Sequence, residues 1–368
     1  MKWFETYSSN TLGGTGNQVH FSTEGQTHVG RIYYKIFAGG TYNYSLLFSN
    51  IMDSTYKFGA ESHCNQICHS WEILSASIGI CKSVTYDEAT DPEAVFPLTF
   101  GGKKEKTVMP GEFFTSDPIL LTAEKGDFLC YEITYSGTMI PYHLESILPT
   151  FVKENGKWVQ DKKVPVPGMI GCDRKVKAKI GYLGDSITQG IGTTPNAYSH
   201  WCALVSEEIG EDYSYWNLGI GYAKGQDAAS DGAWLYKAKQ MDGLVVSYGS
   251  NDVGRGRSLE LMKEDFSSLV STLKNAGVKV FLQSVPPFDW QDEPMERWKA
   301  LNAYLVNELS KECDGFLNIT PLLVDYDAWE GRVKYSNRPD KHPNEEGCRI
   351  WADALLPEFR EFVKKLDK

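Results

Sequence analysis

The alternation of apolar and polar residues changes character near residue 175. Before that point, short runs rich in aromatic and β-branched residues are separated by Gly, Asn and Asp, and no long helical period appears. The clearest runs cover residues 29–38, 43–48, 72–80 and 128–135. Several such strands without helices predict an all-β sandwich, of jelly-roll type, for this part of the chain.

After residue 175, apolar runs alternate with longer segments, some of which have a helical period. The strand candidates are residues 178–183, 213–218, 244–248, 279–283 and 316–319. Strands that alternate with helices predict an α/β fold whose parallel sheet is covered on both faces.

Two helices of this region have clear beginnings, because Ser258 and Asn344 are typical N-cap residues ahead of amphipathic stretches. The first helix should end at Gly277. Its expected apolar face consists of Leu259, Met262, Phe266, Leu269 and Leu273, and that of the last helix of Ile350, Trp351, Leu355 and Phe359. This assignment puts His342 in a loop just before a helix, at the edge of the sheet.

The best candidate for a linker is the stretch of residues 153–175, which is largely polar and contains Pro165, Pro167 and Gly168. We therefore predict two domains. Residues 1–174 would form a β-sandwich accessory domain, and residues 175–368 would form the α/β domain.

The composition excludes several classes of partner. The chain of 368 residues is 42% hydrophobic and carries a net charge of -11, with a pI near 5.2. This acidity argues against nucleic acid or an anionic membrane, because both bind basic surfaces. No run approaches the ~20 apolar residues of a membrane span, and residues 1–8 lack the apolar core of a signal peptide. We expect a cytoplasmic protein with a neutral substrate, and the sequence leaves its oligomeric state open.

The eight cysteines are scattered along the chain and are expected to be reduced. The one local cluster is His63-Cys64 with Cys68-His69, but no second Cys/His pair follows at the spacing of a zinc finger or ribbon. We expect a turn or core position there, and neither a metal nor another cofactor in the protein.

Four polar loops follow the strand candidates, at residues 184–186, 217–222, 249–252 and 340–344. Ligands of open α/β sheets bind outside the carboxyl ends of the strands, so these loops can form one site. Ser186 leaves the first strand, where a nucleophile would be held. A serine hydroxyl attacks carbonyls only beside a positioned base and an oxyanion site, so its importance depends on the other loops.

With these four blocks in order, the region from about residue 177 to residue 368 resembles the SGNH (GDSL-type) hydrolases, a family of flavodoxin-like esterases. The matching residues are Gly184-Asp185-Ser186, the glycine loop near Gly221, Gly249-Ser250-Asn251-Asp252 and His342-Pro343. The resemblance implies that Ser186 is the nucleophile and His342 the general base. The oxyanion would be bound by the Ser186 backbone N–H, an amide of the second block and the Asn251 side chain.

Two positions depart from the pattern of the family. Members commonly carry an Asp three residues before the His, whereas this chain has Pro339 there and Asp340 one position later. Either Asp340 completes a triad or a Ser-His dyad operates. In the second block, the family usually has a small residue followed by Gly where this chain has Gly221 and Tyr222. We expect the Gly221 amide to be the donor, because glycine has the greater φ freedom, with Tyr222 as the alternative.

Each of these residues also has a purely structural interpretation. Ser186 can be an N-cap or turn residue, Asn251 an Asx-turn residue and Asp252 a cap for the following segment. His342 can satisfy a loop carbonyl. Likewise, Gly219 and Gly221 can simply form a tight turn.

The substrate is less defined than the reaction. A GDSL-type domain preceded by a β-rich domain resembles the two-domain carbohydrate esterases that remove acetyl groups from plant polysaccharide fragments, and Tyr222 and Trp290 can stack on sugar rings or belong to the core. The resemblance implies an esterase for short acyl groups on a small molecule or oligosaccharide. The alternatives are a thioesterase or lysophospholipase with the same catalytic set, and a non-catalytic carbohydrate-binding protein.

Overall fold

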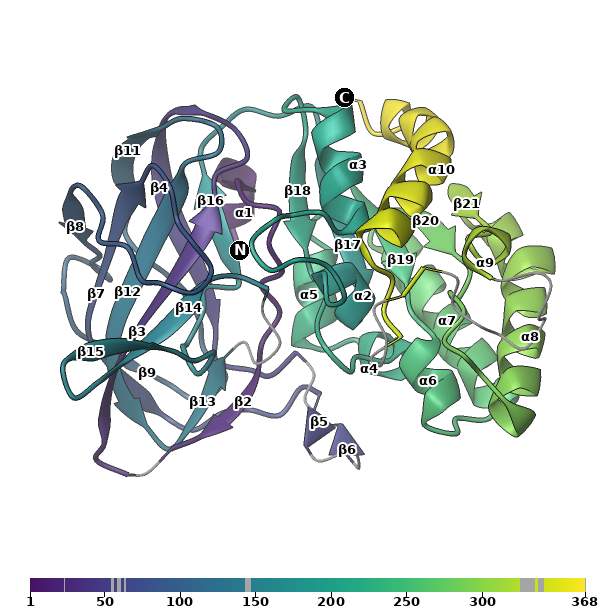
Figure 1. Ribbon diagram of the computed structural model, residues 1–368, viewed down its shortest axis with the longest axis horizontal. Coiled ribbons are helices and arrows are strands. Elements are labelled where there is room, and N and C mark those ends of the chain that lie inside the picture. Colours follow the sequence, from purple (N-terminus) through teal and green to yellow (C-terminus); the bar gives the residue numbers. More distant parts are fainter. Residues whose placement is uncertain are drawn as a thin grey trace. The chain divides into compact units, whose positions relative to one another are not determined.

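The computed structural model describes residues 1–22, 24–53, 56–57, 61–62, 64–142, 147–324, 335–336 and 341–367 (Figure 1). Contacts between Cα atoms divide the chain into two units. The first unit consists of Met1–Val176 together with Ser214–Trp216, and the second of Lys177–Tyr213 and Asn217–Lys368.

The first unit is rich in antiparallel sheets, as expected for a β-sandwich. Within the described residues, one sheet has the strand order β1-β16-β4-β10, with β11 also on β4. The larger sheet has the order β15-β14-β3-β12-β7-β8, with β9 also on β7. The elements of this unit are α1 (Trp3–Thr6), β1 (Ser8–Ser9), β2 (Gln18–Phe21), β3 (Thr27–Lys35), β4 (Gly40–Ser49), β5 (Tyr56–Lys57), β6 (Glu61–Ser62), β7 (Trp71–Cys81), β8 (Val95–Pro97), β9 (Lys106–Val108), β10 (Phe113–Thr115), β11 (Ile119–Ala123), β12 (Phe128–Gly137), β13 (Met139–Tyr142), β14 (Thr150–Glu154), β15 (Lys157–Gln160) and β16 (Met169–Cys172).

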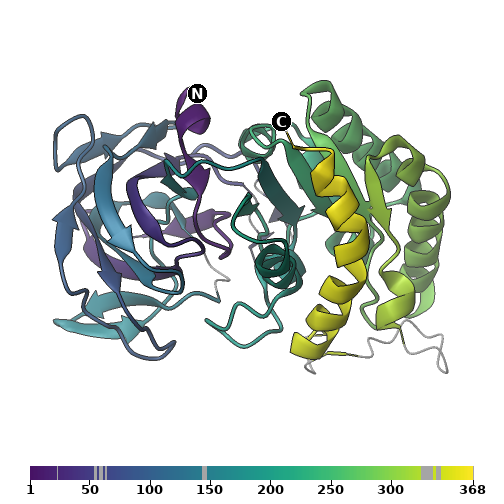
Figure 2. The ribbon, with the colours of Figure 1, turned by 90° about the horizontal axis from the view of Figure 1, so that it is seen from above.

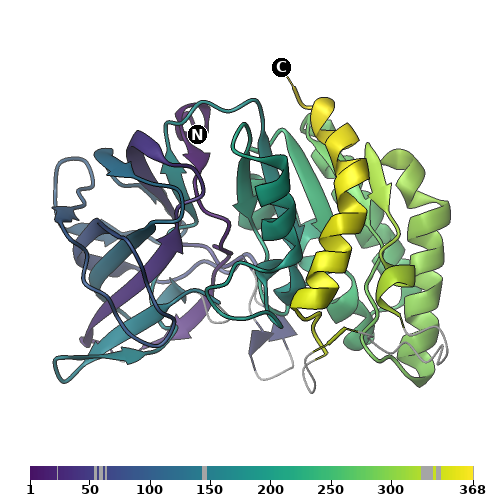
Figure 3. The same cartoon turned by 45° about the horizontal axis from the view of Figure 1, so that its top comes forward.

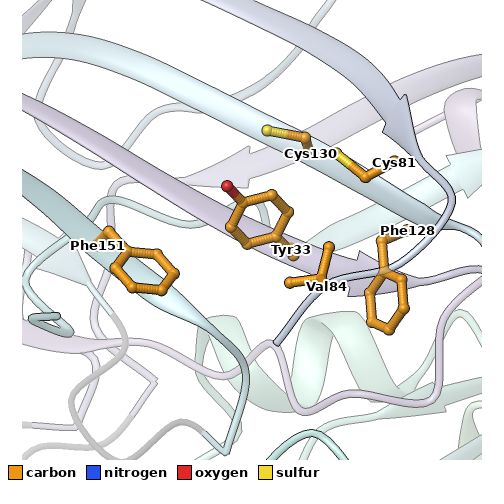
Figure 4. Packing of buried hydrophobic residues seen from close by; sticks show 6 residues of the cluster. All are labelled: Tyr33, Cys81, Val84, Phe128, Cys130 and Phe151. Carbon is orange, nitrogen blue, oxygen red and sulfur yellow. The ribbon is translucent and has the colours of Figure 1, made fainter. Parts of the chain in front are cut away.

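The long strands predicted from the aromatic and β-branched runs are confirmed as β3, β4, β7 and β12. Their side chains build the interior of the unit. One buried cluster lies where β3, β7, β12 and β14 are paired side by side (Figure 4). Its members are Tyr33, Cys81, Val84, Phe128, Cys130 and Phe151.

The predicted linker differs from the structure, because residues 157–160 and 169–172 are the strands β15 and β16. An Asn155-Gly156 turn with positive φ angles of 49° and 81° joins β14 to β15. Both strands were hidden in the sequence for opposite reasons. β15 is largely exposed and therefore polar, whereas β16 is only four residues long and wholly buried.

The second unit is an α/β domain around a sheet with the order β18-β17-β19-β20-β21. The pairs β17–β19, β19–β20 and β20–β21 are parallel. Its strands are β17 (Lys179–Gly184), β18 (Ser214–Asn217), β19 (Gly243–Ser247), β20 (Lys279–Gln283) and β21 (Gly315–Leu317). Its helices are α2 (Ser186–Gln189), α3 (Trp201–Ile209), α4 (Gly225–Ala229), α5 (Ala233–Ala238), α6 (Ser250–Gly254), α7 (Leu259–Asn275), α8 (Asp292–Asn307), the 3₁₀ helix η1 (Leu309–Glu312), α9 (Thr320–Leu323) and α10 (Glu345–Lys364).

Helices α3 and α10 lie side by side against the strands of the second unit (Figures 2 and 3). The rings of Trp201 on α3 and Trp351 on α10 stack with centroids 5.2 Å apart, and both are buried. Helix α7 packs against β20, α4 and α8. None of the helices in the described part of the chain is long and apolar enough to cross a bilayer.

Both predicted N-caps are confirmed, and they fix where the two long helices begin. The Ser258 hydroxyl accepts from the Leu261 N–H at 3.3 Å, and the Asn344 side chain accepts from the Gly347 N–H at 3.0 Å. The second cap holds the beginning of α10 two residues after His342, and so helps to define the position of that loop.

Candidate active site

Ser186 lies at the carboxyl end of β17, as its place in the sequence predicted. The N-cap of the short helix α2 is Asp185, whose side chain accepts from the Ile187 N–H at 2.9 Å. Ser186 is the first residue of the helix, so its own N–H has no acceptor within the helix. Gly184 must be a glycine, because a Cβ there would lie 2.7 Å from the Ser247 carbonyl oxygen of the neighbouring strand. The serine side chain is therefore not used as a cap.

His342 and Ser186 are 156 residues apart in sequence but meet in the structure. The Ser186 Oγ lies 2.8 Å from the His342 Nε2, and both side chains are partly exposed. A neutral imidazole protonated on Nδ1 accepts a hydroxyl proton at Nε2. This geometry can activate a nucleophile, and it is not the contact with a loop carbonyl that the structural interpretation requires.

The loop of His342 is held by a close contact with the turn after α2. Gly192 has a φ of 99°, and a Cβ at this position would lie 2.6 Å from the His342 Cβ and 2.7 Å from the Pro343 carbonyl oxygen. The Thr194 N–H in the same turn donates to the Glu345 Oε1 at 3.1 Å. A glycine at residue 192 thus lets the turn after the nucleophile and the loop of the base approach each other.

Asp340, the predicted acid, lies outside the described residues. Its role as the third member of a triad therefore stays a prediction, as does the alternative of a Ser-His dyad.

Asn251 lies in α6, directly after β19, the strand paired in parallel with β17. The ends of these two strands are neighbours, which brings Asn251 to the same edge of the sheet as Ser186. Its side-chain amide nitrogen donates to the Ala223 carbonyl oxygen at 3.0 Å. That bond uses one of the two N–H groups of the amide and fixes its orientation, so the other can donate to a ligand.

The second block is tied to the nucleophile by Asn217. This side chain accepts from the Gly219 N–H at 2.9 Å and donates to the Thr188 carbonyl oxygen at 3.0 Å, while the Ile220 N–H donates to the Gly184 carbonyl oxygen at 3.1 Å. Gly219 lies directly against α2, where a Cβ would be 2.8 Å from the Thr188 carbonyl carbon. The loop is thus a tight turn, and it also brings its backbone next to Ser186.

The two candidate amides of this block differ in conformation. Gly221 is buried, and Tyr222 has a φ of 63°. A left-handed backbone is unfavourable for a tyrosine, and such residues concentrate at functional sites. The strained residue is therefore the one where the family usually has glycine.

Asp252 supports the site from behind, a role that the sequence did not reveal. Its buried carboxylate accepts from the Gly225 N–H at 2.9 Å and the Gln226 N–H at 3.3 Å, at the beginning of α4. It therefore caps a preceding helix, and not the following segment. Burial raises the pKa of Asp252 to about 6, although the two N–H donors lower it.

The cysteines play no part in this arrangement. All eight are free thiols, and burial raises the pKa of Cys202 and Cys348, which lie on α3 and α10. Of the cluster considered for zinc, His63 lies outside the described residues, and the Nδ1 of His69 lies 3.0 Å from the Thr138 Oγ1. Within the described ranges, no group of three or more His, Cys, Asp or Glu side chains is arranged to hold a metal ion.

The comparisons with known proteins concern the second unit. Residues 182–350 match the GDSL-like lipase/acylhydrolase family. The sequence matches no curated protein. Similar solved structures include a lipolytic G-D-S-L family member from Veillonella parvula (19% identity, TM-score 0.43), a carbohydrate acetylesterase family member from Sinorhizobium meliloti (17%, 0.41) and a carbohydrate esterase family 3 protein from Talaromyces cellulolyticus (18%, 0.40). They cover 50%, 50% and 51% of this chain, and 98%, 99% and 98% of their own.

Proposed function

The second unit carries a GDSL-type (SGNH) hydrolase domain, and we propose that this chain is a serine esterase that removes short acyl groups, above all acetyl, from carbohydrates. The observation that carries the proposal is the 2.8 Å distance between the Ser186 Oγ and the His342 Nε2. A serine at a strand exit becomes a nucleophile only when a base lies within hydrogen-bond reach, and this chain provides one.

In the proposed reaction, the Ser186 Oγ attacks the carbonyl carbon of the ester while the His342 Nε2 takes its proton. The resulting oxyanion is bound by the Ser186 N–H, the Asn251 amide and a backbone N–H of Gly221 or Tyr222. His342 then gives the proton to the leaving alcohol, and an acyl-serine remains. A water molecule attacks this intermediate with His342 again as the base, which releases the acid and restores the serine.

Aromatic side chains next to the base support a short acyl group. The rings of Phe288 and His342 lie with centroids 5.3 Å apart, and Phe288 in turn packs on Trp290 at 5.6 Å. Bulky rings at this point reduce the space for a long acyl chain, whereas half-buried aromatic side chains suit the apolar faces of a sugar. An acidic chain also favours a neutral glycan over nucleic acid or an anionic membrane as its partner. Cytoplasmic processing of imported oligosaccharides remains part of the proposal.

A panel of p-nitrophenyl esters from acetyl to palmitoyl tests the reaction, with the wild type and Ser186→Ala side by side. Hydrolysis that is fastest for acetate and absent in the variant supports the proposal. Fastest hydrolysis at octanoyl or longer would favour a thioesterase or lysophospholipase, and no hydrolysis at all would favour a carbohydrate-binding protein. Acetylated xylo-oligosaccharides then test the carbohydrate, with released acetate as the signal.

A further inference from the structure

A short segment after β20 meets the loop of His342 and deserves a role of its own. It consists of residues 286–290 and connects β20 to α8. Two of its side chains contact the loop before α10, one by charge and the other by ring packing. None of the four sequence blocks includes this segment.

The charged contact joins Asp289 to the residue directly before the base. The Lys341 Nζ lies 3.3 Å from the Asp289 Oδ2, and the side chains are 40% and 14% exposed. Both residues have left-handed backbones, with φ of 63° for Lys341 and 52° for Asp289. A lysine rarely adopts this conformation, so it persists only where surrounding contacts hold it. The ion pair is such a contact, and it acts one residue from His342.

The ring contact acts on the imidazole itself. Phe288 lies edge to face with His342, at 82° between the ring planes. On its other side Phe288 packs on Trp290, whose ring borders Gly254, where a Cβ would lie 3.2 Å from the Cη2 of the tryptophan. Gly254 is in α6, three residues after Asn251. The segment therefore connects the base with the helix that carries the proposed oxyanion donor.

We propose that Asp289 is a positioning residue for the base: through Lys341 it fixes the backbone before His342, while Phe288 limits the rotation of the imidazole, so that Nε2 stays aligned with the Ser186 Oγ. This inference rests on the proposed function of Ser186 and His342. An exposed ion pair contributes little to stability, so the loss of this one should change the rate more than the folding. Small misplacements of a base are costly for the rate.

The test compares Asp289→Asn and Asp289→Glu with the exchanged pair Asp289→Lys/Lys341→Asp, using p-nitrophenyl acetate. We expect Asp289→Asn to lower kcat about tenfold with KM and the melting temperature nearly unchanged, because only the alignment of His342 is lost. Asp289→Glu and the exchanged pair should each recover most of the rate. Glu296→Gln is the matched control, because it removes a carboxylate from another partly exposed ion pair, with Lys299, in the adjacent helix.

A second measurement separates this inference from the proposed function. A fluorophosphonate reacts with an activated serine: the Ser186 Oγ–P bond forms, the P–F bond breaks, fluoride leaves and His342 takes the hydroxyl proton. A wild type that is not labelled at Ser186 would overturn the proposed function. Labelling of the wild type with equal rates for Asp289→Asn, or an exchanged pair no faster than Asp289→Asn, would overturn the role of Asp289 alone.

Discussion

Each unit of the molecule contains a serine and a histidine at hydrogen-bond distance, and the two pairs differ in almost everything else. In the first unit, the Ser22 Oγ lies 2.6 Å from the His28 Nε2, and in the second, the Ser186 Oγ lies 2.8 Å from the His342 Nε2. By distance alone, the first pair is as good a candidate as the second. The distance between a serine and a histidine therefore does not identify a nucleophile.

The surroundings distinguish the two pairs. The Ser22 N–H donates to the Thr138 carbonyl oxygen at 2.8 Å and so is already used, whereas the Ser186 N–H begins a helix. His28 stacks on Tyr135 with centroids 5.3 Å apart, beside a polar pocket of about 540 Å³. Ser186 instead lies at the end of a parallel strand, next to the strand that leads to Asn251. The difference is the set of oxyanion donors that parallel strand ends bring together.

Removal of each serine hydroxyl tests this comparison with the largest expected effect. Ser186→Ala should lower kcat for p-nitrophenyl acetate by about 10⁴-fold or more, because the nucleophile is lost. Ser22→Ala should leave the rate within about twofold. Steady-state kinetics of both variants decide the matter, and a large loss in Ser22→Ala would refute the assignment of catalysis to the second unit.

Asn251 tests the oxyanion donors that only the second pair has. Asn251→Ala should lower kcat by about 10² to 10³-fold with little change in KM, since the lost bond forms mainly in the transition state. Asn275→Ala, an exposed asparagine at the end of α7, is the control. If both variants kept the wild-type rate, Asn251 would be only a link to the Ala223 carbonyl.

Gly192 tests how tightly the second pair is held. Gly192→Ala introduces a methyl group against the backbone of His342, and a shift of about 1 Å there should lower kcat roughly a hundredfold. Gly210→Ala is a matched control, because its φ of 98° creates the same backbone strain with no atom within 4 Å of the added Cβ. Equal losses in kcat for the two variants would mean that strain alone, and not the contact with His342, is responsible.

The sequence predicted the second pair because parallel topology gives a rule for combining distant residues. Ser186, Asn251 and His342 each stand beside the end of a strand or the start of a helix, so the order of elements alone brings the loops to one edge. Antiparallel sheets give no such rule, and the meeting of Ser22 with His28 was not predicted. The first unit also concealed β15 and β16, because neither shows the alternation of a half-buried strand.

The supporting residues were harder to predict, for a different reason. Asp252 caps a helix that precedes it by 27 residues, and Asp289 meets Lys341 across 52 positions. Capping and pairing are recognisable in sequence only when the partners are neighbours, as for Ser258 and Leu261. Contacts between loops depend on the final packing and leave no spacing to read.

Asp340→Asn is expected to have a smaller effect than the changes above. If His342 works in a dyad, the loss in kcat should stay within about tenfold, whereas His342→Ala should lose activity like Ser186→Ala. Parallel kinetics of the two variants measure this. Equal losses above about a thousandfold would show that Asp340 completes a triad.

The smallest effects concern stability, and here the two units should respond to acid with opposite sign. Burial raises the pKa of Asp252 to about 6, above its value in the unfolded chain, so the folded second unit binds this proton more tightly. Its contribution to the free energy of unfolding should therefore increase by about 1.4 kcal/mol as the pH falls from 7.5 to 5. Burial and the nearby Lys163 lower the pKa of His28, so the first unit should lose stability as the pH falls below about 6.5.

Urea unfolding at pH 7.5 and pH 5 measures both responses by comparison with variants that cannot titrate. Asp252→Asn keeps an acceptor for the start of α4 but not the charge, so the wild type should gain stability relative to this variant on acidification. His28→Gln removes the opposite response, so the wild type should lose stability relative to it. Because all other carboxylates are common to each pair of proteins, their titration cancels. Responses of the same sign would mean that the buried charge of Asp252 is not a cost to the folded second unit, and that its bonds to Gly225 and Gln226 outweigh its burial.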